Sequence, residues 1–166
     1  MGVGTGWEVA PEDKPWSDFH WWKVPGKGGI VLALVGKAPL YYIGHFVDGR
    51  MWPCTGEGCG LCERAVGSQI RYVMGAVDIL SRRVGILEVG RANGLLIRDR
   101  CQARGEMCGL VVDLEKHSHA RTSRTEVRFS DKEVGPWVHQ CEVPDLKRAL
   151  ILTWDKANMP VPPGMK

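Results

Sequence analysis

The sequence lacks the long apolar run that a membrane-spanning helix requires. None of its hydrophobic stretches approaches the roughly 18–20 residues needed to cross a bilayer. Its first residues also lack a basic segment followed by an apolar one, so we expect no secretory signal. These absences predict a cytoplasmic protein with no membrane partner, in a bacterial cell or a phage-infected host. In such a reducing setting, cysteines more often bind metal or stay free than form disulfides.

Signatures of the common catalytic machineries are missing too. The chain has no Ser/His/Asp set, and its glycine-rich stretch at residues 2–6 does not follow a strand, as a phosphate-binding loop would. The zinc deaminase pattern H-x-E followed by P-C-x-x-C also fails, because His45 is followed by Phe46 and Val47 instead of a glutamate. We therefore predict that the protein is not an enzyme.

Positive and negative charges nearly balance over the chain as a whole. The net charge of +3 is too small to identify a partner by itself. At 166 residues, 44% hydrophobic and 25% charged, the chain has the size and composition of one globular domain. We expect a flexible N-terminal arm over residues 1–22, a folded domain over residues 23–156 and a disordered tail over residues 157–166.

The pattern of apolar residues predicts a mainly β fold. Apolar runs at residues 29–35 and 40–47 have strand length, and a long strand at 69–80 turns into another at 84–89. A helix near 95–101, ended by Gly105, precedes strands at 110–114 and 125–129 and a C-terminal helix at 144–154. This is the order of an OB-fold, a five-stranded Greek-key barrel with one helix between strands 3 and 4. The glycine-rich residues 48–67 are expected to be an inserted loop.

One cluster of cysteines has the spacing of a metal site. It reads His45-x8-Cys54-x4-Cys59-x2-Cys62, and zinc favours four nitrogen and sulfur ligands in a tetrahedron. We predict one structural zinc ion held by these four residues, because a closed shell leaves no position for a substrate. The alternatives are free thiols or a disulfide in a glycine-rich loop, and His20 in place of His45. Three further cysteines have no ligand spacing and are expected in the core or as incidental thiols: Cys101, Cys108 and Cys141.

The cluster and its flanks resemble the zinc-containing single-stranded DNA-binding proteins of tailed bacteriophages. The likeness covers about residues 23–129: a strand with His, a knuckle with Cys and a later Cys-x2-Cys, then Arg71-Tyr72 on the next strand. It implies an OB-fold with an inserted zinc subdomain and DNA in the cleft between them. The carried-over ligands are those named above, and the carried-over DNA-facing residues are Tyr41, Tyr42, Trp52, Arg71 and Tyr72. An acidic tail and a basic arm are missing from this chain, which bears on partner recruitment and on cooperative binding.

Residue content also favours nucleic acid independently of the resemblance. Between Arg64 and Arg128 there are eleven arginines and one lysine against seven acidic residues. Arginine can bind phosphate or stack on a base, and aromatic faces add stacking for single strands. We expect contacts from Arg50, from Trp52 in the exposed loop, and from Arg121 and Arg124 between the last two strands. Phe46 is expected in the core, whereas Trp21-Trp22 could be core, a clasp or an interaction patch.

The sequence therefore predicts a sequence-tolerant single-stranded DNA-binding protein of a phage or mobile element, acting in replication or recombination. Replication or recombination proteins are its expected protein partners. A zinc-stabilised protein-interaction module of such a complex is the alternative from another class. An RNA-binding protein is a further alternative, because stacking and phosphate contacts serve both nucleic acids.

Overall fold

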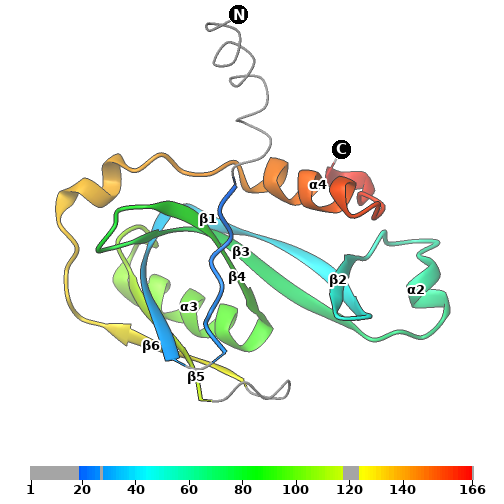
Figure 1. Cartoon of the computed structure of the whole chain (residues 1–166), viewed down its shortest axis with the longest axis horizontal. Helices are drawn as coiled ribbons and strands as arrows, with labels where there is room; N and C mark the ends of the chain where they lie inside the picture. Colours follow the sequence, from blue (N-terminus) through cyan, green and yellow to red (C-terminus); the bar gives the residue numbers. More distant parts are fainter. Residues whose placement is uncertain (1–18, 27, 118–123, 166) are drawn as a thin grey trace, which may run out of the picture.

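A mainly antiparallel sheet organises the molecule. The computed structural model describes residues 19–26, 28–117 and 124–165 (Figure 1). Within these residues, six strands form a sheet that does not close, in the order β4-β3-β1-β5-β6 with β2 paired to β1. The strands are β1 (Gly28–Val47), β2 (Arg50–Pro53), β3 (Ser68–Asp78), β4 (Val84–Gly90), β5 (Val111–Lys116) and β6 (Thr125–Ser130). The helices are α2 (Gly60–Glu63), α3 (Arg91–Arg104) and α4 (Leu146–Lys156), with 3-10 turns η1 (Pro136–Gln140) and η2 (Pro163–Met165). The mainly β prediction is confirmed, and the expected closed five-stranded barrel is replaced by an open six-stranded sheet.

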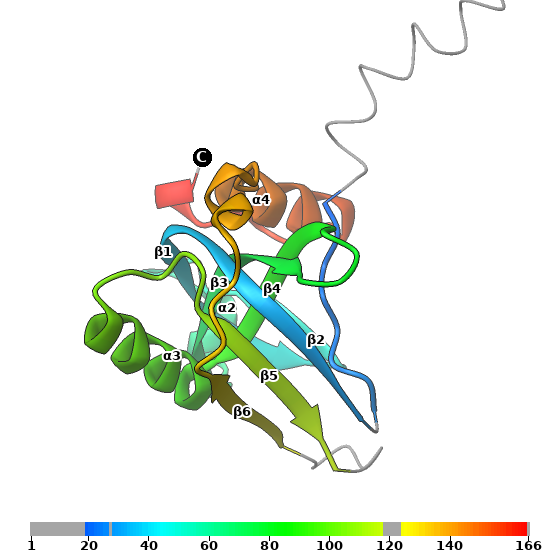
Figure 2. The same cartoon turned by 90° about the vertical axis from the view of Figure 1, so that its left-hand side faces the viewer.

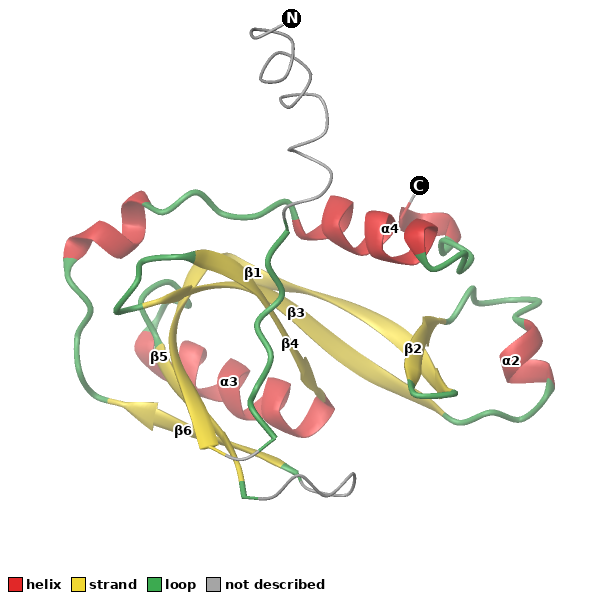
Figure 3. Ribbon diagram, in the orientation of Figure 1, coloured by secondary structure: helices red, strands yellow, loops and turns green. Residues whose placement is uncertain are grey.

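The first strand is one element where two apolar runs were expected. β1 continues for 20 residues, and its pairing with β3 shifts register between Val35 and Leu40. Gly36 adopts φ +94°, which lets the chain bulge without breaking the strand. The shift lengthens the β1–β3 pair into a ribbon that extends beyond the rest of the sheet (Figures 1 and 3).

Helices α3 and α4 lie on different sides of the sheet (Figures 1 and 2). On one side, Leu34, Met74 and Leu87 pack with Ile97 of α3. On the other, the cluster around Trp154 of α4 includes Tyr42, Val73, Ile86 and Leu150. Each side of the central strands therefore has its own apolar core, because neighbouring strand residues alternate faces.

Residues 19–22 line the free edge of β4, although they fall within the expected flexible arm. Trp22 N donates to Ile86 O at 2.8 Å, and Ile86 N donates to His20 O at 2.7 Å. The Trp22 indole also donates to Ala76 O at 3.0 Å, which makes this segment a clasp on the sheet. The remainder of the expected arm, residues 1–18, lies outside the described residues.

Local chemistry sets one boundary of each long helix: the C-terminal end of α3 and the N-terminal start of α4. Gly105 follows α3 with φ +91°, the left-handed conformation that was expected to end this helix. The Asp145 side chain caps α4 by accepting from Arg148 N at 3.1 Å. Within the tail expected to be disordered, Met159 is 7% exposed and residues 163–165 form η2. Among the described residues, no helix is long and apolar enough to span a bilayer.

A small distal lobe, residues 48–67, sits at the far end of the β1–β3 ribbon (Figure 3). It holds β2 and the one-turn helix α2, so the expected insertion loop has secondary structure of its own. From residue 54 to residue 67, only Cys59 is buried. Residues 54–67 therefore have no apolar core of their own, whereas Met51 and Trp52 pack against the cluster around Trp154.

Candidate metal centre and basic groove

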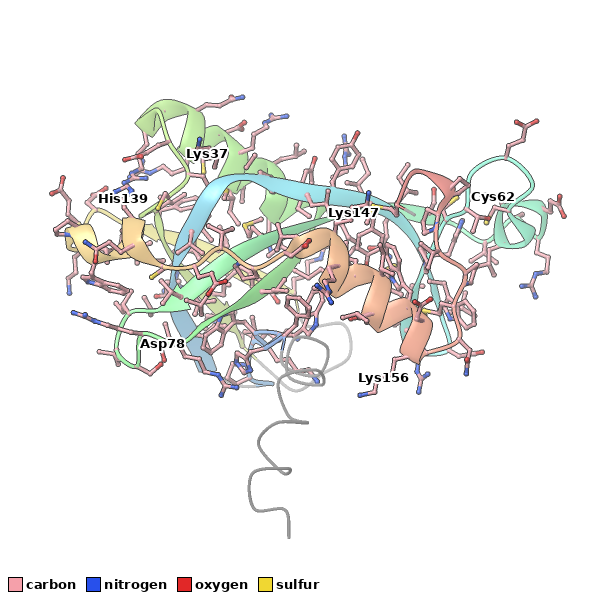
Figure 4. All side chains as sticks on the ribbon, turned by 90° about the horizontal axis from the view of Figure 1, so that it is seen from above. Lys37, Cys62, Asp78, His139, Lys147 and Lys156 are labelled. Carbon is pink, nitrogen blue, oxygen red and sulfur yellow. The ribbon has the colours of Figure 1, made fainter. Side chains whose placement is uncertain are left out.

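The four predicted ligands meet inside the distal lobe. His45 comes from β1, Cys54 follows β2, Cys59 immediately precedes α2 and Cys62 lies within it. Their ligand atoms all lie within 4.8 Å of one another. Figure 4 shows Cys62 at the end of the molecule opposite Asp78 and His139. The cluster could hold one metal ion.

The distances within the cluster fit a tetrahedral ion. Cys54 Sγ lies 3.6 Å from Cys62 Sγ, and His45 Nε2 lies 3.7 Å from Cys59 Sγ and 3.5 Å from Cys62 Sγ. Ligands about 2.1–2.3 Å from a central zinc stand about 3.5–3.8 Å apart at the corners of a tetrahedron. These residues thus have the donor types and the spacing for such an ion.

His45 is held in the orientation that a ligand needs. Its side chain is 0% exposed, and Nδ1–H donates to Val66 O at 3.0 Å and to Gly67 O at 3.2 Å. Because carbonyl oxygens only accept, the proton sits on Nδ1 and the lone pair of Nε2 faces the thiols. The rival ligand His20 packs edge-on against Trp22 and is not among the residues that converge here.

The thiols are in unequal electrostatic environments. Backbone N–H groups, first that of Cys62 and then that of Thr55, lower the pKa of Cys59 to about 5. The hydrogen bond with the Cys54 side chain, and after it the burial of the thiol, raise the pKa of Cys62 to about 11. Burial lowers the pKa of His45, but hydrogen bonds to Cys54 and Gly67 raise it overall. A divalent cation bound here would stabilise the deprotonated form of each thiol.

The other three cysteines lie in the body and are half-buried. Cys101 packs against the α3 core. Cys108 and Cys141 pack against a third apolar cluster, around Ala33 and Val111. None of the three belongs to a group with metal-ligand geometry among the described residues.

A basic groove runs from the distal lobe along the body. It consists of three adjoining hollows of about 390, 720 and 580 Å³. The first two share Trp21 and Arg50, and the last two share Arg71 and Glu88. Among the described residues, its lining includes a single acidic residue, Glu88, and seven basic ones: Lys23, Arg50, Arg71, Arg91, Lys116, Arg124 and Lys156. Such a groove attracts a polyanion.

The groove collects four of the eight residues expected to contact nucleic acid: Tyr42, Arg50, Arg71 and Arg124. Tyr42 is a correction, since it is 7% exposed and its ring packs edge-on against Trp154. Burial and the neighbouring Glu88 carboxylate raise the pKa of Tyr42, so its hydroxyl stays a donor. Its ring face is covered, and it supports the groove floor instead of stacking on a base.

Two other expected contacts lie on the opposite face of the ribbon. Tyr41 is 63% exposed and its ring centroid is 6.3 Å from that of Tyr72. Tyr72 in turn lies beneath Gly94 of α3. Phe46, expected in the core, is 50% exposed, because its part of β1 extends beyond the body. The predicted aromatic surface is therefore divided between two faces.

Of the last two expected contacts, Trp52 differs from its predicted loop position. Trp52 lies on β2, half-buried against the cluster around Trp154, where we expected an exposed loop residue. In the β1–β2 register Trp52 pairs with His45. Arg121 lies outside the described residues.

Several groove residues could not be selected from the sequence. Lys23, Arg91 and Lys156 come from three distant segments, which only the fold brings to one groove. Lys156 lies at the C-terminal end of α4 (Figure 4). A weak signal existed for Trp21, since the Trp21-Trp22 pair stood out, but its place was open between core, clasp and patch.

The resemblance to phage single-stranded DNA-binding proteins rests on the cysteine–histidine spacing and on the strands around it. The fold brings the four spaced residues together and adds a basic groove beside them. The family assignment stays a prediction from the residues, because comparison of the chain with protein-family models, curated proteins and solved structures returned no match.

Proposed function

We propose that the cluster of His45, Cys54, Cys59 and Cys62 binds one structural zinc ion. Three thiolates and one imidazole form the donor set of closed structural zinc sites, whereas magnesium and calcium take oxygen ligands. Zinc would stand in for the apolar core that residues 54–67 lack, and it would fix the segment that follows β2. Because Arg50 begins β2, the ion would also set where this arginine stands in the basic groove.

The body is a variant of the OB-fold that lacks the strand pairing that would close the barrel. The sheet order β4-β3-β1-β5-β6 and the position of α3 between β4 and β5 support this assignment. Closure of the barrel would need β4 to pair with β6. Residues 20–22 occupy the edge of β4 instead.

The protein binds single-stranded DNA in the basic groove, as part of the replication or recombination of a phage or mobile element. The observation that carries this proposal is the groove lining of seven basic residues and one acidic residue. Its position between the lobe and the β5–β6 turn is also that of the ligand face in OB-folds. Half-buried Trp21 offers an aromatic side chain at the end where Arg50 and Lys156 stand.

Fluorescence anisotropy tests the proposal directly. Zinc-loaded protein is titrated with labelled oligo-dT, duplex DNA and single-stranded RNA at two salt concentrations. We expect the tightest binding for oligo-dT, with an affinity that falls steeply with salt as arginines release counterions from phosphates. Tighter binding of RNA would replace DNA as the ligand, and an affinity that does not change with salt would refute a phosphate-lined groove.

Paired variants locate the binding surface. Arg50→Gln and Arg124→Gln each remove one groove cation and should weaken binding, with the salt slope falling by about one per arginine. Arg100→Gln is the matched control, since Arg100 is ion-paired with Asp131 and does not line the groove. Cys59→Ser should weaken binding by loosening the lobe. Unchanged DNA affinity in a folded, metal-free Cys59→Ser protein would show that the groove binds DNA without the metal.

A protein-interaction module is the second candidate, and the opposite face of the ribbon favours it. Tyr41 and Ile43 are 63% and 45% exposed on the same side of β1. Beside them, Tyr72, Met74 and Ile97 contribute to a cavity of about 410 Å³. Co-purification of a protein without nucleic acid, abolished by Ile43→Asp, would support this function.

A further inference from the structure

Glu88 is an exception in the groove. It projects from β4 where two of the hollows adjoin, and its side chain is 23% exposed. Every other charged residue of the lining is basic. A carboxylate repels phosphate, so this position suits a hydrogen-bond donor of the ligand instead of its backbone.

Two neighbours hold the Glu88 carboxylate in place. Arg71 Nε donates to its Oε1 at 2.8 Å, and the Tyr42 hydroxyl donates to the same oxygen at 3.0 Å. Oε2 has no hydrogen-bond partner among the described residues. The side chain is therefore fixed in direction and keeps acceptor capacity for a ligand.

The chemistry of this acceptor selects one base. In single strands, the Watson–Crick edge of an unstacked base is open to side chains. Guanine presents two adjacent donors there, N1–H and the N2 amino group. Adenine and cytosine place a ring-nitrogen lone pair beside their amino group, and thymine flanks its N3–H with two carbonyl oxygens. A carboxylate is repelled by those lone pairs and pairs best with guanine.

We propose that Glu88 reads guanine, so that the groove has one base-selective position within an otherwise sequence-tolerant surface. This inference rests on the proposed function, because it needs single-stranded nucleic acid in the groove. Arg71 and Tyr42 are the positioning residues, since they orient the carboxylate. The inference adds selectivity to the sequence-tolerant binding that the composition predicts.

Matched oligonucleotides test it on the zinc-loaded full chain. Anisotropy competition compares oligo-dT with versions carrying one central guanine or one hypoxanthine, which lacks only the N2 amino group. We expect the guanine version to bind about tenfold tighter than either of the others, within the range for one well-placed base contact. Glu88→Gln should equalise the three affinities, whereas Glu126→Gln, an acidic residue of β6 outside the groove, should keep the preference.

The outcomes separate the two proposals. Equal, salt-sensitive binding of all three oligonucleotides to the unaltered protein overturns the guanine inference and leaves single-strand binding intact. No binding of any of them overturns both. If Glu88→Gln fails to fold, as judged by its circular dichroism melting curve, the guanine-to-hypoxanthine comparison on the unaltered protein still decides the question.

Discussion

The body and the distal lobe are stabilised by different means. In the body, Leu32–Val35 of β1 and Val73–Val77 of β3 are buried without interruption, whereas in the lobe only Cys59 is buried between residues 54 and 67. The body can fold by removing apolar surface from water, which is worth about 25 cal/mol per Å². Residues 54–67 bury almost no such surface, so we expect their order to depend on bonds from His45 and three thiolates to the proposed ion. On this proposal, one chain combines a hydrophobic domain with a segment that folds around a metal ion.

Metal removal should have the largest effect and should break only the lobe. Structural zinc contributes about 10–16 kcal/mol of binding free energy in small zinc domains, and most of it is folding energy. After chelation, we expect amide hydrogen exchange over residues 54–67 to lose its protection while that of residues 73–77 remains.

Cys59→Ser should reproduce this loss in the presence of zinc, and Cys101→Ser, a half-buried thiol of α3, is the matched control. Retained protection of the lobe without any metal would show that the loop folds by itself. Loss of protection in the body as well would show that the two regions are one cooperative unit.

The converse change is Leu34→Ala, which should damage only the body. Leu34 is 0% exposed and packs with Met74 and Leu87, so truncation leaves a cavity. We expect the free energy of unfolding to fall by about 2–5 kcal/mol, measured by urea denaturation, with zinc affinity unchanged. Leu80→Ala, at a side chain that is 91% exposed, is the control. A parallel fall in zinc affinity would link the two regions.

The same contrast explains which site residues could be predicted from the sequence. The four predicted ligands lie within 18 residues of one another, from His45 to Cys62, so spacing alone selected the residues that the fold brings together. The groove draws Lys23, Arg91 and Lys156 from distant segments, and no local pattern connects them. Local chemistry suffices for a site made by one turn, whereas a surface made by tertiary packing needs the fold.

The alternation of side chains along a strand predicts the positions of Tyr41 and Tyr42 only in part. It requires Tyr41 and Tyr42 to face opposite ways, but it does not say which side is covered. Trp154 of α4 decides this by packing on Tyr42. The bulge after Val35 was hidden for a similar reason, because Gly36–Pro39 looks like a turn between two strands until β3 is seen to pair on both sides of it.

A third change, Gly94→Ala, affects the contact between α3 and Tyr72 of β3. A Cβ on Gly94 of α3 would overlap the ring of Tyr72, which must then shift. We expect Gly94→Ala to destabilise the protein by about 1–3 kcal/mol through overpacking, despite the better helix propensity of alanine. Differential scanning calorimetry measures the shift, with Gly164→Ala, where a Cβ meets nothing within 4 Å, as control. A stabilised Gly94→Ala protein would mean that Tyr72 moves freely and that the ribbon is hinged here.

The smallest expected effect concerns α4, which packs against both regions. Its cluster joins Trp154 to Tyr42 of the body and to Trp52 of the lobe. Asp145→Ala removes the cap on Arg148 N and should lower the free energy of unfolding by about 1 kcal/mol in urea denaturation, whereas Asp145→Asn keeps the acceptor and should change it less. If the proposed metal bonds hold residues 54–67 independently of α4, the zinc affinity should not change. A lower zinc affinity in Asp145→Ala but not in Asp145→Asn would show that α4 transmits stability from the body to the lobe. The two regions would then be stabilised by different means and would still depend on each other.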